Sequence, residues 1–418
     1  MNMREMKDSG ILGYGPIPHN WKISKVKYIT KFKAGVAHEG SWDYEGNYII
    51  VNSRFVSTEG DTQYKFSDKQ LLPLVTDDIC IVLSDLPNGR ALARCLYITD
   101  NNKYTLNQRV GAFYSYNIFG RFFYYLMDRN VGLLKYDDGM NQTNLQYEDV
   151  YNCEVIIPPE QEQIRIACLL DKKCDDIKAI VSDIQSQIEA LEEYKRSVIT
   201  EAVTKGLDPD VEMRDSGVQW IGMMPTHWDC QRGKYILRYV QKPVRDDDGV
   251  ITCFRDGEVT LRSNRREEGF TMADKEIGYQ GIDVGDLVVH GMDGFAGAIG
   301  ISDSRGKASP VLNVLDTEQN KRYIMYYLRS MAYNDVFVAL ATGIRVRSCD
   351  LRWNKLAELL YPLPPIEEQQ AIVEHIDSVL ERTNAIIADK KQQIETIEEY
   401  KKSLIFEYVT GKKEVVNE

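Results

Sequence analysis

The second half of this chain repeats the outline of the first half. Four short phrases recur in the same order, with an offset of 207 residues for the early phrases and 206 for the late ones. They pair Asp8-Ser9-Gly10 with Asp215-Ser216-Gly217, Pro18…Trp21 with Pro225…Trp228, Pro158–Gln163 with Pro364–Gln369, and Glu193-Tyr194-Lys195 with Glu399-Tyr400-Lys401. A duplicated chain can present two similar surfaces about a pseudo-two-fold axis, and duplex DNA has a backbone of matching symmetry.

Length and composition indicate a soluble protein of more than one domain. The 418 residues exceed what one core normally holds. A hydrophobic content of 43% and a charged content of 27% are typical of globular proteins. We find no apolar run of about 18 residues and no apolar signal core, so we expect no membrane contact. The eight cysteines form no Cys-x-x-Cys pair, which favours reduced thiols and a cytoplasmic location.

The net charge of -12 is distributed unevenly along the chain. Residues 22–157 carry 15 basic and 16 acidic side chains, and residues 229–361 carry 19 of each. The excess of acid therefore lies mainly in residues 158–208 and 362–418. A balanced block can still present a basic face to DNA, so the total charge neither supports nor excludes DNA binding.

Each repeat has a lead-in ending at a tryptophan, a mixed block of about 130 residues, and a long helical segment opened by two prolines. We predict an α+β fold with pseudo-two-fold tandem duplication: two similar mixed α/β domains separated by two long antiparallel, coiled-coil-like helices. The predicted boundaries are a first domain at 1–157, a central helical spacer at 158–206, a linker and second domain at 207–361, and a C-terminal helical spacer at 362–418.

Inside the mixed blocks, apolar runs at 48–51, 78–83 and 286–289 predict strands. A short aromatic helix is predicted at 122–127 and again at 323–328. We align its two copies on Tyr124-Tyr125-Leu126 and Tyr326-Tyr327-Leu328. Elsewhere the two blocks align poorly.

The long segments have heptad spacing, which is typical of a coiled-coil seam. Ile177, Ile184, Leu191 and Val198 recur every seven residues. About 40 residues would give a rod on the order of 60 Å. We favour antiparallel pairing of the two helices within one chain, because a parallel pair would need about 17 extended linker residues. A coiled coil between two chains is the alternative.

Several kinds of chemistry are missing. The sequence has no phosphate-binding Gly-x-x-x-x-Gly-Lys-Ser/Thr, no glycine-rich turn for S-adenosylmethionine, and no metal-binding spacing among its five histidines. His290 could act as a ligand or a base, but a lone histidine in a turn more often does neither. We therefore expect no catalysis and no cofactor in this chain.

Polar loop residues of the mixed blocks are candidates for reading DNA, because arginine can bridge guanine and asparagine or glutamine can bridge adenine. The null hypothesis for each is an ordinary solvated loop. The candidates are Asn88, Arg90, Asn107, Gln108, Arg109, Asn141, Gln142 and Asn144 in the first block, and Arg262, Asn264, Arg265, Arg266, Arg345 and Arg347 in the second.

On these repeated phrases the chain resembles the specificity subunits of type I restriction–modification systems. The lead-ins, the double-proline phrases and the helix tails carry the resemblance over essentially the whole chain. It implies two target recognition domains that each read half of a split DNA site, with the helices fixing the spacer. It also implies two methyltransferase subunits and restriction/translocase subunits as partners, which would bring S-adenosylmethionine, ATP and Mg.

Two other interpretations remain open. An acidic coiled-coil scaffold that binds no nucleic acid would also suit the low pI of about 5.1. A self-sufficient nuclease or methyltransferase is disfavoured by the missing motifs. The sequence specifies neither the bases recognised nor the length of the spacer.

Overall fold

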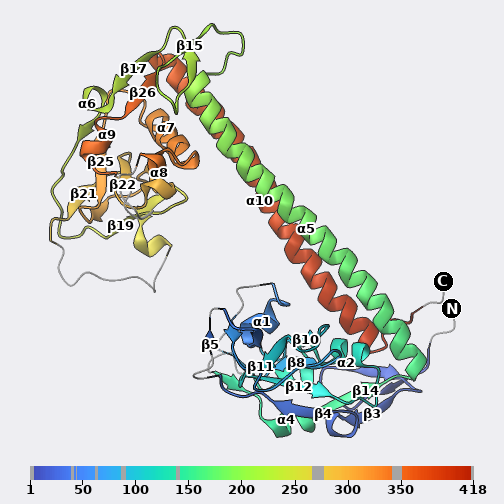
Figure 1. The fold of residues 1–418 in the computed structure, drawn as a ribbon. Helices are drawn as coiled ribbons and strands as arrows, with labels where there is room; N and C mark the ends of the chain where they lie inside the picture. Colours follow the sequence, from blue (N-terminus) through green and yellow to red (C-terminus); the bar gives the residue numbers. More distant parts are fainter. Residues whose placement is uncertain are drawn as a thin grey trace. The chain divides into compact units, whose positions relative to one another are not determined.

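The computed structural model describes residues 4–38, 42–43, 45–61, 65–85, 91–137, 142–265, 277–340 and 351–415. The chain forms two compact units, Met1–Asp183 with Gln393–Glu418, and Ile184–Gln392. Two long helices, α5 (Glu160–Lys205) and α10 (Ile366–Val409), each contribute one half to either unit (Figure 1). The predicted helical segments at 158–206 and 362–418 contain these helices. The predicted domain boundaries end each domain where its helix starts, whereas the compact units include the helix halves that pack against them.

The same antiparallel sheet forms the centre of both units. In the first unit its order is β10 (Cys95–Tyr97), β8 (Ile79–Val82), β12 (Val110–Tyr114) and β4 (Lys31–Ala34). In the second unit its order is β23 (Ile299–Ile301), β22 (Leu287–His290), β25 (Leu312–Asp316) and β18 (Arg238–Tyr239). The central strands pair Ile79 with Phe113 and Leu287 with Leu315, so even the register is repeated. The duplication therefore extends into the blocks whose sequences align poorly.

The remaining elements are short. In the first unit they are β1 (Met6–Asp8), β2 (Pro16–Pro18), β3 (Lys22–Lys25), η1 (Val26–Tyr28), β5 (Trp42–Asp43), β6 (Tyr48–Val51), α1 (Ser53–Ser57), β7 (Phe66–Ser67), β9 (Ser84–Asp85), β11 (Tyr104–Leu106), α2 (Gly120–Met127), α3 (Val131–Leu134), β13 (Thr143–Asn144), α4 (Tyr147–Tyr151) and β14 (Glu154–Ile157). In the second unit they are β15 (Met213–Asp215), β16 (Met223–Pro225), β17 (Asp229–Arg232), α6 (Gly233–Ile236), β19 (Ile251–Cys253), β20 (Val259–Leu261), η2 (Arg262–Asn264), β21 (Gln280–Ile282), η3 (Gly294–Ala296), β24 (Gly306–Ala308), α7 (Lys321–Tyr333), α8 (Val336–Ala339), α9 (Trp353–Leu356) and β26 (Leu360–Leu363).

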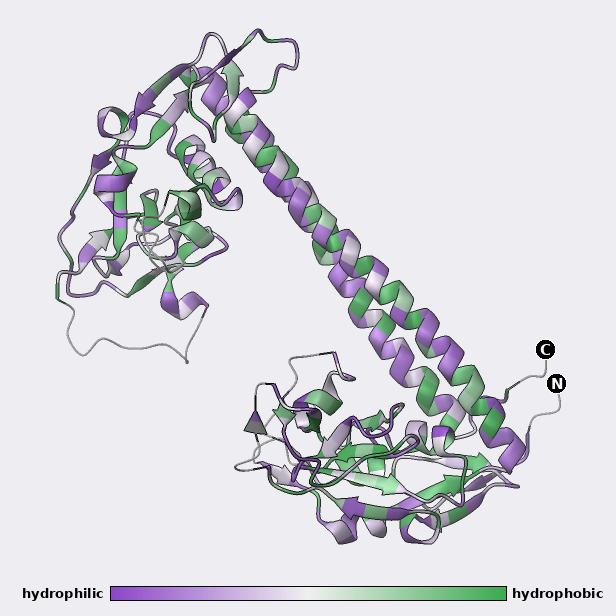
Figure 2. Cartoon of the chain, viewed as in Figure 1, coloured by the Kyte–Doolittle hydropathy of each residue, from purple (hydrophilic) through white to green (hydrophobic). Residues whose placement is uncertain are grey.

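The predicted strands at 48–51, 78–83 and 286–289 are confirmed as β6, β8 and β22, within one residue at each end. Their alternation is weak because both faces of the central sheet are covered. All four residues of β8 are fully buried, as are the first three of β22. The apolar strands are visible as green arrows in Figure 2.

Each lead-in phrase packs against the start of a long helix through its tryptophan. We call this contact the tryptophan dock. Trp21 and Trp228 are each 1% exposed. The indole Nε1 of Trp21 donates to the carboxylate of Glu162 at 3.0 Å, and that of Trp228 donates to Glu368 at 3.1 Å. The first-turn glutamates thus satisfy a buried donor in addition to favouring the positive end of the helix.

The glutamine that closes each double-proline phrase holds the aromatic helix. Gln163 Oε1 accepts from the Phe119 amide at 2.8 Å, immediately before α2. Gln369 Oε1 accepts from the Asn320 amide at 2.9 Å, immediately before α7. Each amide nitrogen donates to the first proline carbonyl of its phrase. The phrase therefore links three chain segments, which explains its repetition.

The two aromatic helices are docked by one repeated contact, and it corrects their alignment. Asp171 on α5 accepts from Arg121 Nε at 2.7 Å and from Tyr125 Oη at 2.6 Å. Asp377 on α10 accepts from Arg322 and Tyr326 in the same way. Tyr125 is therefore the counterpart of Tyr326, one residue away from the Tyr-Tyr-Leu alignment. The alignment matched identical side chains and was therefore wrong by one residue. The residue that fixes each tyrosine, Asp171 or Asp377, lies on another helix, so the sequence of the aromatic helix does not reveal it.

The long helices pair antiparallel, as predicted. In the second unit the end of α5 (Ile199 and Val203) shares a core with the start of α10 (Ile372 and Ile376). In the first unit the start of α5 (including Leu170) shares a core with the end of α10. Figure 2 shows the alternation of hydrophobic and hydrophilic residues along both helices. None of the described helices is apolar over a stretch long enough to cross a membrane.

Polar residues interrupt the seam of α10 where α5 has isoleucine. Thr383 is buried, and its hydroxyl donates to the Val379 carbonyl at 2.7 Å, so it is satisfied within its own helix. Lys390 Nζ donates to Gln187 Oε1 on α5. The second of these contacts joins the two helices and helps to fix their register.

Candidate nucleic-acid interface

Two polar segments of the first unit converge on one backbone position at the end of β8. The Leu83 amide donates to the Arg109 carbonyl at 3.0 Å, and the Leu83 carbonyl accepts from the Leu145 amide at 2.7 Å. β13 then pairs Asn144 with Ser84. The turn that holds Asn107, Gln108 and Arg109 and the strand that holds Asn144 therefore flank the same residue. We call this arrangement the Leu83 junction.

The side chains around the Leu83 junction are those of a polar surface. Gln108, Arg109, Gln142 and Asn144 are exposed, and Asn107 is half-buried. Gln142 Nε2 donates to Ser84 Oγ at 2.9 Å, which orients the amide. Within the described part of the chain, the Arg109 guanidinium makes no ion pair. An exposed, unpaired arginine beside oriented amides has the donor set that base edges and phosphates accept.

The turn at 107–109 is positioned by close backbone packing against Gly35. A Cβ on Gly35 would lie 1.9 Å from the Asn107 carbonyl oxygen, so only glycine fits there. The Gly35 amide donates to the Val110 carbonyl, and the Asn107 amide donates to the Val51 carbonyl. The turn is thus fixed from two sides, and its side chains project from a rigid base.

The second unit has the same junction with different side chains. The Gly291 amide donates to the Val311 carbonyl at 2.8 Å, and the Gly291 carbonyl accepts from the Leu351 amide at 2.8 Å. Both bonds correspond to those of Leu83, so we call this arrangement the Gly291 junction. Val311 stands where the first unit has Arg109, and the exposed Met292 follows the strand where the first unit has Ser84.

The His290 side chain stabilises the turn at the Gly291 junction. Its Nδ1 accepts from the amides of Met292 at 3.2 Å and Asp293 at 2.9 Å, so it closes the turn. Burial lowers the pKa of His290, which keeps the ring a neutral acceptor. The ring therefore has a structural role. No group of three or more histidine, cysteine or acidic side chains in the described ranges could hold a metal ion.

The candidates at 262–265 lie elsewhere, on and directly after η2, which follows β20, and their side chains make contacts within the protein. Arg262 Nε donates to Thr252 Oγ1, and Asn264 Nδ2 donates to Thr260 Oγ1. Arg265 contacts Asp256 at 2.7 Å and Glu258 at 2.9 Å, and its guanidinium lies 4.1 Å from the ring centroid of Phe254. Arg265 would have to exchange these contacts in order to bind DNA.

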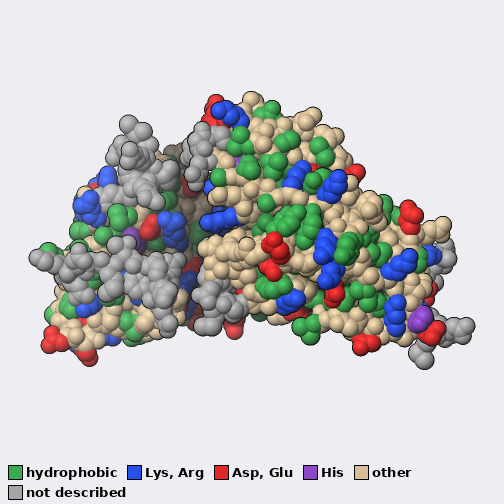
Figure 3. All heavy atoms as spheres, turned by 90° about the horizontal axis from the view of Figure 1, so that it is seen from below, with side chains coloured by type: hydrophobic (Ala, Val, Ile, Leu, Met, Phe, Trp, Pro, Cys, Tyr) green, Lys and Arg blue, Asp and Glu red, His purple; other side chains and the backbone are tan. Residues whose placement is uncertain are grey.

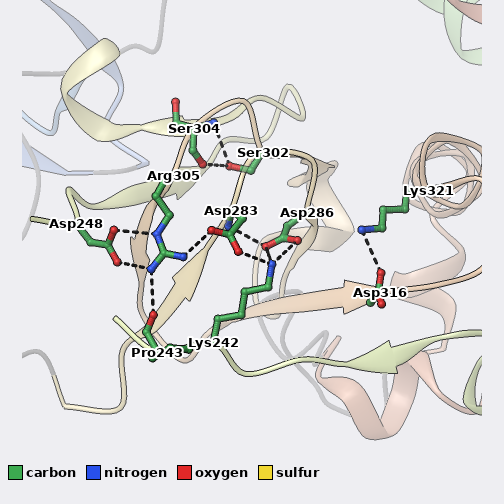
Figure 4. A network of polar contacts seen from close by, with 10 residues as sticks. All are labelled: Lys242, Pro243, Asp248, Asp283, Asp286, Ser302, Ser304, Arg305, Asp316 and Lys321. Atoms are coloured by element: carbon green, nitrogen blue, oxygen red, sulfur yellow. Dashed lines mark hydrogen bonds and ion pairs between the residues drawn. The ribbon is translucent and has the colours of Figure 1, made fainter. Parts of the chain in front are cut away.

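A chain of ion pairs braces the second unit at the opposite end of β22 (Figure 4). Lys242 joins Asp286 and Asp283, and Arg305 joins Asp283 and Asp248. Hydrogen bonds from Lys242 and Arg305 lower the pKa of Asp283 to about 2. Burial lowers the pKa of Lys242, but its hydrogen bonds to Asp283 and Asp286 outweigh burial and the net pKa is raised.

The first unit has a smaller ion pair at the corresponding place. Lys33 contacts Asp78 at 2.8 Å. Asp78 directly precedes β8, as Asp286 directly precedes β22 in the second unit. Asp78 also accepts from the Val75 amide, as Asp286 does from Asp283. Both carboxylates are nearly fully buried and therefore need these partners.

Comparison with known proteins shows to which family this repeated architecture belongs. The family model for the type I restriction modification DNA specificity domain matches residues 18–190 and 285–396. The chain belongs to the type I restriction–modification DNA specificity family. The specificity subunit of type I restriction enzyme MjaVIII from Methanocaldococcus jannaschii is 22% identical over 424 residues, covering 96% of this chain and 95% of that protein. The family resemblance predicted from the repeated phrases is confirmed.

A solved structure has the same fold, and a second one resembles it more distantly. A chain from a study of complex assembly and conformational transition of the type I R-M system matches with a TM-score of 0.63 and 13% identity, covering 94% of this chain and 98% of that one. The HsdS subunit from Thermoanaerobacter tengcongensis matches with a TM-score of 0.47 and 12% identity, covering 95% and 98%. The first of these supports the predicted fold class, an α+β specificity subunit with two long antiparallel helices.

Six candidate residues of this specificity subunit lie outside the described residues: Asn88, Arg90, Asn141, Arg266, Arg345 and Arg347. Asn88 and Arg90 follow β9, and Asn141 directly precedes Gln142. Arg347 lies four residues before Leu351, as Asn141 lies four before Leu145. They stay predictions.

One candidate was missed from the sequence. Arg54 is exposed in the first turn of α1, and Ser53 beside it donates to the Ser84 carbonyl at 3.4 Å. Asn52 caps α1 by accepting from the Phe55 amide at 2.9 Å. An asparagine directly after an apolar strand is a helix-start signal, and it would have placed Arg54 in a helix that begins where that strand ends.

Proposed function

We propose that this chain is the DNA-reading, non-catalytic subunit of a type I restriction–modification enzyme, and that each unit reads one half of a bipartite site. The paired helices set the spacer between the half-sites. Two methyltransferase subunits dock on the chain, and restriction/translocase subunits join through them. S-adenosylmethionine, ATP and Mg act in those partners.

The observation that carries this proposal is the contrast between the Leu83 and Gly291 junctions. Two surfaces with the same backbone scaffold and different side chains suit two readers of different base sequences. Arg109 can donate two parallel hydrogen bonds to guanine, whereas Val311 offers only apolar contact, for example to a thymine methyl group. A scaffold without DNA would not require a repeated junction with divergent polar side chains.

The helix tails support docking of two copies of one partner. Tyr194 and Tyr400 occupy equivalent positions and are 51% and 55% exposed. Glu193 and Glu399 precede them and are also exposed. The phrase around each tyrosine is kept as well, as Glu192-Glu193-Tyr194-Lys195 and Glu398-Glu399-Tyr400-Lys401, whereas exposed positions further along the helices have diverged, for example Asp176 to Arg382. An exposed aromatic side chain that persists in both copies is typical of an interface rather than of a solvated helix face.

The test is a genome-wide map of methylated adenines in the source strain, with this gene intact, deleted, or carrying Arg109→Ala. The deletion should remove one bipartite motif. Arg109→Ala should relax one half of that motif and leave the other half unchanged, and it should weaken specific binding of the assembled complex by about 1–3 kcal/mol.

Lys178→Ala, which removes an exposed charge from α5, is the matched control and should leave the motif intact. A map that keeps every motif after deletion would reject the proposal. A change in both half-motifs after Arg109→Ala would reject the assignment of one half-site to each unit.

A further inference from the structure

Both units expose an equivalent lysine–tyrosine pair whose ring lies mostly in solvent. Tyr28 is 68% exposed and Tyr235 is 73% exposed. Lys27 Nζ lies 5.3 Å from the Tyr28 ring centroid, and Lys234 Nζ lies 5.4 Å from that of Tyr235. The two tyrosines are 207 residues apart, which is the offset of the repeated lead-ins. We call them the paired tyrosines.

The same contacts hold both pairs in place. Lys27 Nζ donates to Asn152 Oδ1 at 3.0 Å, and Lys234 Nζ contacts Glu358 Oε1 at 3.1 Å. Beneath them the Val26 amide donates to the Cys153 carbonyl, and the Gly233 amide donates to the Leu359 carbonyl. Both rings therefore stand on a short helical turn that is pinned to the segment leading into a long helix. A preorganised ring loses little entropy on binding.

Residues around the paired tyrosines have diverged while the pairs have not. Exposed Lys22 corresponds to Asp229, and Asn152 corresponds to Glu358. Within the described chain, neither tyrosine hydroxyl has a hydrogen-bond partner. Exposing an aromatic ring contributes nothing to folding, because its apolar area stays in water. Retention in both units therefore points to contact with another molecule.

The shared chemistry favours a protein over a DNA phosphate. In the first unit Lys25 and Lys31 make no ion pair with the described residues, so this unit alone could attract phosphate. In the second unit Arg232 and Lys234 both contact Glu358. Arg238, the counterpart of Lys31, contacts Asp316 and Glu318. The property common to both units is the ring beside one lysine, and tyrosine is enriched among interface anchors.

Figure 3 views the molecule from the side on which Figure 1 draws β3, β4 and α4 of the first unit. Lys and Arg side chains lie there beside hydrophobic ones, with some Asp and Glu side chains among them. A partner that fits this surface has an apolar pocket with acidic groups at its rim. Because equivalent rings occur on both units, one partner protein can be bound twice by the same contact.

We propose that Tyr28 and Tyr235 anchor two equivalent docking surfaces, one on each unit, and that each receives one copy of the methyltransferase subunit. This inference rests on the proposed function. It adds a contact on the recognition domains to the contact expected on the helices, and it explains how two partner copies bind a chain whose DNA-reading surfaces differ.

The experiment is a titration of the full-length chain with the purified methyltransferase subunit of the same restriction–modification system, followed by native mass spectrometry and calorimetry. The wild-type chain should bind two copies. Tyr28→Ala and Tyr235→Ala should each weaken one of the two sites by about 30-fold, which is the size of a hot-spot truncation, and the double variant should weaken both. Tyr→Phe at either position should bind as the wild type does, since the hydroxyl is unpaired.

Tyr136→Ala is the matched control. Tyr136 is 44% exposed and lies 4.9 Å from Lys135 Nζ, but this Lys-Tyr pair occurs in the first unit alone. The control should keep both sites intact, and thermal melts should show that all variants fold. Unchanged binding in the double variant would overturn the proposal, and so would a loss in Tyr→Phe as large as in Tyr→Ala.

Binding of DNA separates the remaining outcomes. If the alanine variants keep both partner copies but bind DNA of every sequence more weakly and with a smaller salt dependence, the paired tyrosines contact phosphates and the proposal is wrong. If the wild-type chain itself recruits no methyltransferase subunit, the docking part of the proposed function fails, and this is visible without any variant.

Discussion

The tryptophan docks and the junctions are both repeated, but at different levels. At the docks the side chains are the same in both units, with a buried indole donating to a first-turn glutamate and a glutamine capping the aromatic helix. At the junctions only the backbone hydrogen bonds are the same, and Arg109 is replaced by Val311. Side chains that build the frame have been kept, and side chains that project from the frame have changed. This division suits the proposed function, in which two different half-sites are read on one scaffold.

Removing the indoles should produce the largest effect and should affect the two units equally. Trp21→Ala and Trp228→Ala each empty a fully buried site and remove one hydrogen bond from a glutamate carboxylate, so each should destabilise its own unit by about 3–5 kcal/mol. Hydrogen exchange measured on peptides from each unit would detect this. Val75→Ala and Val284→Ala truncate exposed valines and should change stability by less than about 0.5 kcal/mol. A tryptophan whose loss leaves its unit unchanged would break the comparison.

The aspartates that dock the aromatic helices should give the next largest effect. Asp171→Ala and Asp377→Ala each leave a partly buried tyrosine hydroxyl and an arginine without this acceptor. Because an unsatisfied buried donor is costly, we expect about 1–3 kcal/mol for each. Faster exchange in α2 after the first change, and in α7 after the second, is the expected result. If Asp171→Ala instead loosened α7, the assignment of one dock to each unit would be wrong.

The sequence predicted the frame well because local phrases make the frame contacts. The lead-in phrase, the double prolines and the heptad repeat each predict a structure from residues that are close together in the sequence. The equivalence of the two central sheets was invisible, since core strands tolerate exchange of one apolar residue for another. The one-residue error in aligning Tyr124 with Tyr326 has the same origin: the residue that decides the register, Asp171, lies on another helix.

The candidate site was predictable in kind but not in arrangement. The residues at 107–109 and 142–144 are polar and lie in loops, as predicted, yet their convergence depends on backbone hydrogen bonds of Leu83, which leave no side-chain signal. The ion pairs of Arg265 with Asp256 and Glu258 lie within ten residues of sequence and could have been anticipated. Which of these residues contact DNA stays a prediction.

Adding charge at the Gly291 junction would sharpen the comparison. Val311→Arg gives the second unit the guanidinium that the first unit has. If the junction faces DNA, the plot of log Kd against log salt for the assembled complex should steepen by about 0.9, because one more counterion is released. Val284→Arg adds the same charge at the opposite end of β22 and should leave the slope unchanged. Equal slopes for both variants would mean that the Gly291 junction does not face DNA.

The smallest expected effect is a pH dependence carried by the ion-pair chain of the second unit. The folded-state pKa of Asp283 is about 2, below its ordinary value of 3.8, so its contacts stabilise the fold fully above about pH 4 and lose that contribution as pH falls through about 2. The carboxylate is 42% exposed and is screened by water, so we expect less than about 1 kcal/mol. Asp283→Asn should therefore lower the melting temperature at pH 7 and have little effect near pH 2.

Asp246→Asn is the control for this pH dependence. Asp246 is exposed in the same loop as Asp248, and within the described ranges it makes no ion pair. Its replacement should leave the melting temperature unchanged at both pH values. A difference between the wild type and Asp283→Asn that stays constant from pH 7 to pH 2 would show that the amide changes packing rather than charge. The ion-pair chain would then not distinguish the acid response of the second unit from that of the first.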